Sequence, residues 1–181
     1  MTLFDRFRNR PLQASTTQRK VRDQPGPMTA HEAWAIVRPV AHELDPRARL
    51  TFITSGLDMS REGRSFTWEF LFHLPGGRAR ALLTLEPNRE TGDIDNAPII
   101  LVQRLTPASA AELDRASVLP ERFRDSPEVV AEFAAGGVDF VAGPTDMKLE
   151  GRVLDTGEAV WVTYYWDGER KASFTAVTQP R

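Results

Sequence analysis

The segment at residues 66–74, FTWEFLFHL, strongly constrains how this chain folds. Every second position carries a large apolar side chain: Phe66, Trp68, Phe70, Phe72 and Leu74. Because side chains alternate between the two faces of a β-strand, all five fall on one face. Burying five such side chains contributes about 8–15 kcal/mol as an upper bound. The sequence therefore predicts a strand with one face in the hydrophobic core.

A hairpin and a preceding helix complete this pattern. The turn Pro75-Gly76-Gly77 leads into residues 79–85, where Ala and Leu alternate with other residues. Upstream, Thr29 and Glu32 have the spacing of a capping box, and apolar residues recur at helical spacing from there to residue 44. We expect a helix with a kink or break at Pro39, then strands at 48–54 and 99–105.

The C-terminal half repeats this order of elements. Ser126 and Pro127 are typical of a helix start, with Ser126 as the cap, and Gly136-Gly137 predicts a break or a close helix–sheet contact. Strands are expected at residues 147–154, 159–166 and 170–178. The dipeptide Asp167-Gly168 predicts a two-residue hairpin turn, which pairs Trp161 with Phe174.

The two halves together predict an α+β fold made of two tandem α-β-β-β units. We expect a flexible basic arm at 1–27, a first unit at 28–105, and a linker helix with the second unit at 106–181. The linker helix begins at Thr106 as N-cap. One unit alone is close to the smallest size that supports a stable core, so the two are expected to share one.

The first unit resembles a PepSY domain over residues 29–95, and residues 126–178 look like a divergent second copy. The resemblance rests on the helix TAHEAWAIV and on the stretch TLEPNRETGDI, in which Thr91-Gly92-Asp93 matches the family's Thr-Gly-acid turn. It implies a small helix-plus-antiparallel-sheet fold, PepSY-like or cystatin-like in style. It also implies a protein-binding or inhibitory role and no catalytic residues.

Charge and composition set further limits. The chain has 181 residues and a net charge of −2, yet the first 27 residues hold six basic and two acidic side chains, so an arm of +4 precedes a body of −6. There is no cysteine, which excludes disulfides and thiolate chemistry. No secretory signal and no membrane span are recognisable, so we expect a cytoplasmic protein. The acidic body argues against nucleic acid as a partner.

The arm allows two interpretations. Leu3, Phe4 and Phe7 share one face of a short helix, with Arg6 and Arg10 nearby. This face is a candidate anchor for a membrane surface or a partner. Alternatively, the arm is a disordered leader, and Phe4 and Phe7 fold back on the body.

The sequence contains no recognisable catalytic, cofactor or metal motif. His31 and His42 are too far apart for a metal pair, and Glu69 and His73 lie about 13 Å apart along a strand. The loop at residues 90–96 carries alternating carboxylates, which favour either a solvated turn or a weak cation site. No catalytic, cofactor-binding or metal-binding residue is assigned.

Two functions remain open. The first is a non-catalytic binding module, an inhibitor or adaptor, whose partner is another protein or a second copy of the chain. Its candidate surface is Tyr164, Trp166 and Lys171 on the second hairpin, because aromatic side chains beside charges are typical of binding surfaces. The alternative is a small-molecule binder or enzyme with a pocket between the two units.

Overall fold

The computed structural model describes residues 16–20, 26–57, 59–77, 79–87, 98–105, 117–138, 148–166 and 170–178. The helices in these ranges are α2 (Ala30–Leu44) and α4 (Ser126–Ala135), with one 3-10 turn, η1 (Pro75–Gly77). The strands are β1 (Thr16–Lys20), β2 (Arg49–Ser55), β3 (Trp68–Leu74), β4 (Ala79–Pro87), β5 (Pro98–Leu105), β6 (Lys148–Val153), β7 (Ala159–Trp166) and β8 (Arg170–Ala176).

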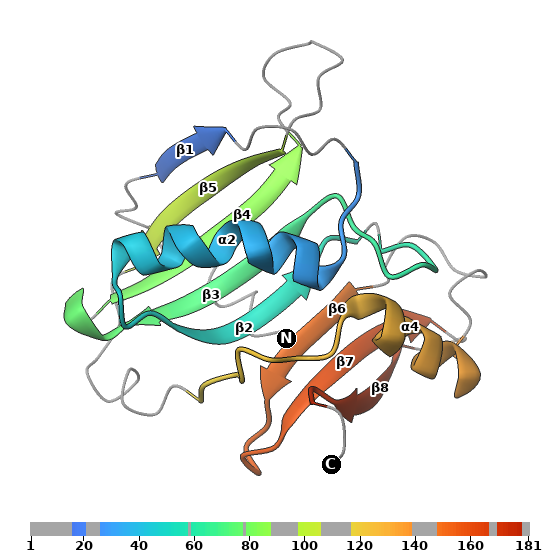
Figure 1. Ribbon diagram of the computed structural model, residues 1–181. Coiled ribbons are helices and arrows are strands. Elements are labelled where there is room, and N and C mark those ends of the chain that lie inside the picture. Colours follow the sequence, from blue (N-terminus) through green and yellow to red (C-terminus); the bar gives the residue numbers. More distant parts are fainter. Residues whose placement is uncertain are drawn as a thin grey trace.

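All the described strands belong to one antiparallel sheet, in the order β1-β5-β4-β3-β2-β6-β7-β8 (Figure 1). Strands β2 to β5 follow one another as a meander, and so do β6 to β8. The two meanders join where Ile53 pairs with Gly151 and Thr54 with Glu150. The predicted α+β class with an antiparallel sheet is confirmed, and a single sheet passes through both halves of the chain.

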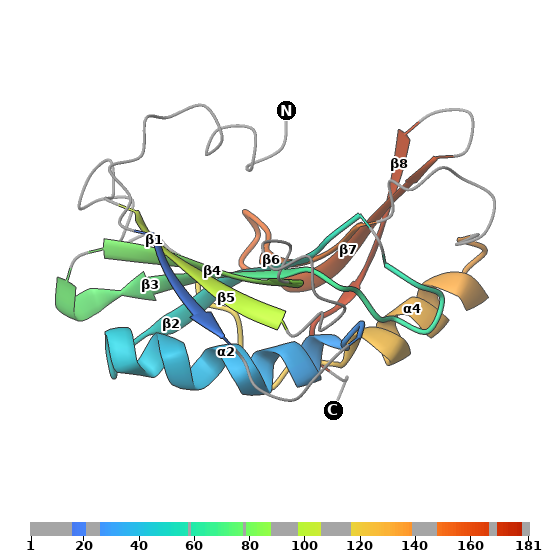
Figure 2. The ribbon, with the colours of Figure 1, turned by 90° about the horizontal axis from the view of Figure 1, so that it is seen from above.

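Both described helices lie on the same face of the sheet (Figure 2). Helix α2 packs against β3 and β4, and α4 packs against β8. We call this side the helix face and the opposite side the second face. Trp68, Phe70 and Phe72 of β3 point to the helix face, where they are buried in the main hydrophobic cluster.

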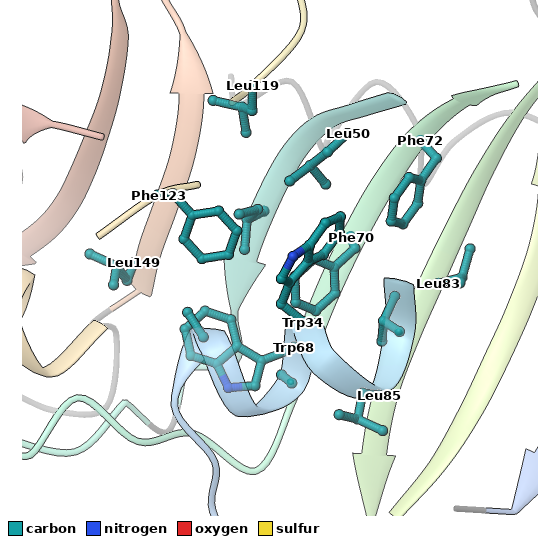
Figure 3. Packing of buried hydrophobic residues seen from close by; sticks show 14 of the residues in the cluster. Trp34, Leu50, Trp68, Phe70, Phe72, Leu83, Leu85, Leu119, Phe123 and Leu149 are labelled. Atoms are coloured by element: carbon teal, nitrogen blue, oxygen red, sulfur yellow. The ribbon is translucent and has the colours of Figure 1, made fainter. Parts of the chain in front are cut away.

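The core under α2 is built on stacked aromatic rings. Trp34 of the helix stacks on Phe72, with ring centroids 5.8 Å apart and planes 12° apart, and lies 5.9 Å from Phe70 (Figure 3). Ala81 of the neighbouring strand is completely buried. It pairs across the ladder with Phe72, the residue on which Trp34 stacks.

Helix α2 begins as predicted but does not break. The Thr29 hydroxyl accepts the Glu32 N–H at 3.2 Å, and the Glu32 carboxylate accepts the Thr29 N–H at 2.9 Å. Of the kink or break expected at Pro39, the break is wrong, because one helix runs through that residue. The flanking Val37 and Val40 are buried in the core, and their packing offsets the hydrogen bond that proline removes.

Phe66 departs from the predicted apolar face of β3. The other four large side chains of that face are buried, whereas Phe66 is 42% exposed and precedes the strand. The Ser65 hydroxyl accepts the Thr67 N–H at 3.2 Å, and Ser65 also forms an isolated bridge with Met28. This local turn takes Phe66 out of the strand alternation.

Part of the predicted flexible arm is a strand. Within residues 1–27, β1 pairs with β5 from Thr16 opposite Gln103 to Lys20 opposite Ile99. Five residues of the expected arm therefore lie in the sheet as β1. Its composition argued for disorder, but an edge strand gains its stability from the ladder with its neighbour.

The end of α4 and the strands of the second half follow the predictions, whereas the predicted linker helix cannot be compared. Helix α4 ends at Ala135, and Gly137 has φ +89°, so the predicted break at the glycine pair is confirmed. The strands at 148–153, 159–166 and 170–176 agree with the predicted ranges to within two residues. The linker helix predicted from Thr106 lies almost wholly outside the described residues.

Candidate functional site

An apolar strip on the second face of β7 and β8 reaches the edge of the sheet. Val162 pairs with Phe174, and Tyr164 pairs with Ala172. Val162 is fully buried and Tyr164 is half-buried, whereas 53% of Phe174 is exposed. The strip thus runs from a buried row of side chains to an exposed aromatic ring on the last strand.

This strip depends on the register between β7 and β8, which differs by one residue from the predicted register. The expected pair of Trp161 and Phe174 is wrong, because Trp161 pairs with Thr175 and Phe174 with Val162. Residues 167–169 separate the paired Trp166 and Arg170, so the predicted two-residue turn is one residue too short. A shift of one residue moves every side chain of β8 to the other face, and it carries Phe174 from the core to the second face.

Strand β8 ends the strand order, so among the described strands it pairs with β7 alone. A strand at the edge of a sheet presents unpaired backbone N–H and C=O groups along its outer side. Such an edge is a template for an extended segment of another chain. The exposed Phe174 ring projects from this edge strand.

On the helix face, α4 and the segment before it hold β8 in place. The Thr175 hydroxyl donates to Glu132 Oε1 at 2.6 Å, and the Arg124 guanidinium bridges Glu132 and Thr175. The Arg124 backbone N–H donates to the Val177 carbonyl at 2.7 Å. The Thr175 hydroxyl and the Arg124 guanidinium lower the pKa of Glu132. These contacts join β8 and the residue after it to α4 and to the segment before α4.

Strand β6 places charged side chains next to the apolar strip. Lys148 Nζ lies 3.3 Å from Glu150 Oε1, and the Glu150 side chain is almost completely buried. Arg152 has its Nε atom buried, with no hydrogen-bond acceptor among the described residues. A buried carboxylate requires a compensating charge, which Lys148 supplies here.

The residues proposed from the sequence are only partly described. Tyr164 lies in β7 beside the strip. The backbone of Trp166 lies in β7 and pairs with Arg170, and the backbone of Lys171 lies in β8 and pairs with Tyr165. The side chains of Trp166 and Lys171 fall outside the described part. The predicted register placed Lys171 opposite Tyr164. In the structure, Lys171 pairs with Tyr165 instead. Phe4, Phe7 and the acidic loop at residues 90–96 also lie outside the described residues.

Two polar residues of β3 have structural roles on the second face. His73 Nδ1 lies 3.2 Å from an Arg49 guanidinium nitrogen, across the pairing of β2 with β3. Glu69 is half-buried and stands between Thr54 and Thr84 on the neighbouring strands. Within the described ranges, no group of three or more His, Asp or Glu side chains is arranged to hold a metal ion.

The N-termini of the two helices meet at a junction that sequence reasoning missed. Asp125, rather than the predicted Ser126, is the N-cap of α4, and its Oδ1 accepts the N–H groups of both Ser126 and His31 at 2.9 Å. The Ser126 hydroxyl accepts the Ala30 N–H at 2.9 Å and donates to the Gly63 carbonyl at 2.6 Å. One Asp-Ser pair thereby satisfies the first donors of both helices. In the sequence, the only sign of this junction is that Asp125 and Ser126 are residue types typical of helix caps.

The histidines of α2 contact backbone carbonyls rather than each other. His31 Nε2 lies 2.6 Å from the Phe123 carbonyl, and its ring is 5.0 Å from the Phe123 ring. His42 Nδ1 lies 3.2 Å from the Pro46 carbonyl at the other end of the helix. Neither belongs to a cluster of titratable groups that suggests catalysis.

Two further findings bear on the kind of protein this is. In the described part of the chain, neither helix has the length and apolar character needed to cross a membrane. No protein-family model, curated protein or solved structure matches this chain.

Proposed function

We propose that this protein is a non-catalytic binding module that takes up an extended segment of another protein chain along β8. The observation that carries the proposal is Phe174, a large apolar side chain that is 53% exposed on the last strand of the sheet. An open backbone edge supplies hydrogen bonds, and a side chain at alternate spacing supplies selectivity. The partner is another protein or a second copy of the chain.

The hydrogen bonds that hold β8 from the helix face support this mode of binding. The Thr175–Glu132–Arg124 network holds the strand from the helix face, so little conformational entropy is lost when a partner strand is added. Phe174 contributes apolar area on the second face, next to the Tyr164 side chain of β7. Full burial of a phenylalanine side chain contributes about 1.5–3 kcal/mol, and the exposed half of Phe174 supplies part of that.

The proposal includes a tandem architecture and an inhibitor or adaptor role of the PepSY type, with the protein in the cytoplasm. The order of elements supports the tandem architecture, since α2 precedes the meander β2 to β5 and α4 precedes the meander β6 to β8. The first strands of the two meanders pair with each other in the middle of the sheet. In this proposal, two units that each begin with a helix share one sheet and one helix face.

A small-molecule site between the two halves fits the structure less well. At the junction of the helices, Ser126 contacts Ala30 and Gly63 directly. A Cβ atom added at Gly63 meets backbone atoms of Pro127 at 2.5 Å. The halves are therefore in direct contact at this junction.

The test uses a library of random linear peptides, selected for binding to the whole protein. We expect selected peptides to shift the amide signals of β8 and to lose at least about tenfold in affinity for Phe174→Ser, which corresponds to about 1.4 kcal/mol. Leu57→Ser is the matched control, because Leu57 is 57% exposed outside the edge strand. Sedimentation equilibrium of the same variants reports whether a second copy is the partner.

Unchanged binding by Phe174→Ser, or signal shifts confined to other strands, would rule out the β8 edge as the binding surface. An equal loss of affinity in the Leu57 control would point to a nonspecific apolar effect.

A further inference from the structure

The second face carries a separate apolar cluster in the first half of the sheet. Phe52, Leu71 and Leu105 are 3%, 8% and 6% exposed, and the partly buried Leu82 packs against them. The ladder places Phe52 opposite Leu71, Leu71 opposite Leu82, and Leu82 opposite Gln103. This second-face cluster thus forms a row across β2, β3 and β4, with Leu105 on β5.

The burial of this cluster requires a covering layer. An apolar sheet face becomes inaccessible to water only when another layer of the protein packs on it. Both described helices lie on the helix face, so they do not supply that layer (Figure 2). Neither described helix therefore covers the second-face cluster, and a candidate cover is a segment of the chain that can reach it.

The position of β1 identifies the segment that best reaches the cluster. Thr16, the first residue of β1, pairs with Gln103, and Gln103 pairs with Leu82 of the cluster. Two strand spacings of about 4.8 Å therefore separate the start of β1 from Leu82. Fifteen residues precede Thr16. Even as a helix they span about 22 Å, which is enough to cross the row.

The composition of that segment fits the surface. Leu3, Phe4 and Phe7 are apolar side chains at helical spacing, and Arg6, Arg8 and Arg10 accompany them. The next row of the sheet on one side of the second-face cluster contains Glu69 and Glu150, on either side of Thr54. The next row on the other side contains Arg49, His73 and Arg80, and Glu150 is already paired with Lys148. The match between segment and surface therefore rests on the apolar side chains.

We propose that residues 3–7 of the chain's own N-terminal segment dock on the second-face cluster, with Phe4 and Phe7 against Phe52, Leu71 and Leu82. The arm is then part of the folded body rather than a free leader. This docking site is independent of the β8 edge, so either proposal can fail without the other.

The absence of cysteine permits a direct distance measurement. A nitroxide is attached to Thr2→Cys in the full chain, and the broadening of leucine methyl signals is recorded. We expect strong broadening at Leu71, Leu82 and Leu105 and weaker broadening at Leu83 and Leu85, which face the helices. A label at Ala134→Cys, on an exposed position of α4, is the control and is expected to spare the cluster.

Two other occupants give different results. Residues 106–116 also leave the sheet beside Leu105, and a label at Ala110→Cys tests them. Broadening of the cluster from position 110 but not from position 2 overturns the proposal. So does broadening seen only between labelled and unlabelled copies in a mixture, because it assigns the surface to a second chain.

A stability measurement provides the second test. Phe4→Ser with Phe7→Ser is expected to lower Tm by roughly 5 °C or more, since about 2–4 °C is lost per kcal/mol in a chain of this size. Leu57→Ser with Val118→Ser removes two exposed apolar side chains and is expected to lower Tm clearly less. Equal, small shifts in the two double variants would overturn the docking.

Discussion

Asp125 Oδ1 accepts the backbone N–H of His31 at 2.9 Å, so the residue that caps α4 also binds the first turn of α2, 94 positions away in the sequence. The same oxygen accepts the Ser126 N–H, and the adjacent Ser126 hydroxyl accepts the Ala30 N–H. The starts of the two helices therefore depend on one another. Together with the β2–β6 ladder, this junction connects the two halves of the chain through hydrogen bonds.

Replacing Asp125 by Ala removes the N-cap of α4 and one hydrogen bond to the first turn of α2. We expect the free energy of unfolding to fall by about 1–3 kcal/mol, since one cap contributes about 1 kcal/mol. Unfolding should remain a single transition, with coincident curves from tryptophan fluorescence and far-ultraviolet circular dichroism. Asp155→Ala, in the exposed turn after β6, is the control. Two separate transitions in the parent would show that the halves unfold independently.

The two fully buried tryptophans of the sheet should respond differently to phenylalanine. Trp68 Nε1 donates to the Met28 carbonyl at 2.9 Å, whereas Trp161 Nε1 is buried with no acceptor among the described residues. Trp68→Phe loses a hydrogen bond, while Trp161→Phe removes an unsatisfied donor. We expect Trp68→Phe to be more destabilising by about 1–3 kcal/mol in urea unfolding. Equal losses would indicate that the Trp161 indole N–H is hydrogen-bonded in solution.

Two glycines with positive φ provide a matched pair. Gly63 has φ +72°, and an added Cβ would lie 2.5 Å from Pro127 N. Gly157 has φ +86°, with nothing within 4 Å. We expect Gly157→Ala to cost about 1–2 kcal/mol from backbone strain alone. Gly63→Ala adds a steric clash with the start of α4, so its Tm should fall clearly further. A similar Tm for both variants would contradict the close contact at the junction.

The acid sensitivity of the protein should depend on Asp45, the C-cap of α2. The Arg47 N–H, at 2.9 Å, is the main cause of its lowered pKa, and the Gly76 N–H adds to it against the opposing effect of burial. Because the pKa is lower in the folded state, the stabilisation is present above the unfolded value of about 3.9. It is lost as the pH falls through the folded pKa.

Asp45→Asn should therefore be less stable than the parent near neutral pH. The difference should shrink as the pH falls below about 4, measured as the free energy of unfolding in urea. Glu43→Gln, at an exposed position of the same helix, is the control for a nonspecific change in charge. A difference that stays constant down to the lowest pH would show that the Asp45 charge does not stabilise the fold.

Much of the fold was predictable because it depends on local patterns. The alternation in β3 and β4 and the capping box at Thr29 and Glu32 each involve residues close in sequence. For such elements, side-chain periodicity and hydrogen bonding within a few residues determine the structure. The helix preceding each meander was predictable for the same reason.

The candidate site was less predictable because it depends on register. Tyr164 was selected from its residue type, yet the neighbour assigned to it was wrong. A single additional residue between β7 and β8 decides whether Phe174 faces the core or the second face. Local turn propensity favoured the shorter loop, and packing across the sheet decided otherwise. The exposure of Phe174, on which the proposed function rests, is therefore a tertiary property.

The sequence by itself determined the secondary structure of most described elements, the α+β class and the apolar face of β3, because these follow from residue spacing over one or two turns or strands. Only the tertiary structure decided that both meanders form one sheet through β2 and β6, that both described helices cover the same face, and that Asp125 binds the first turns of both of them. Those features join residues about a hundred positions apart. Their energies arise from contacts that exist only once the chain has folded, so no local pattern encodes them.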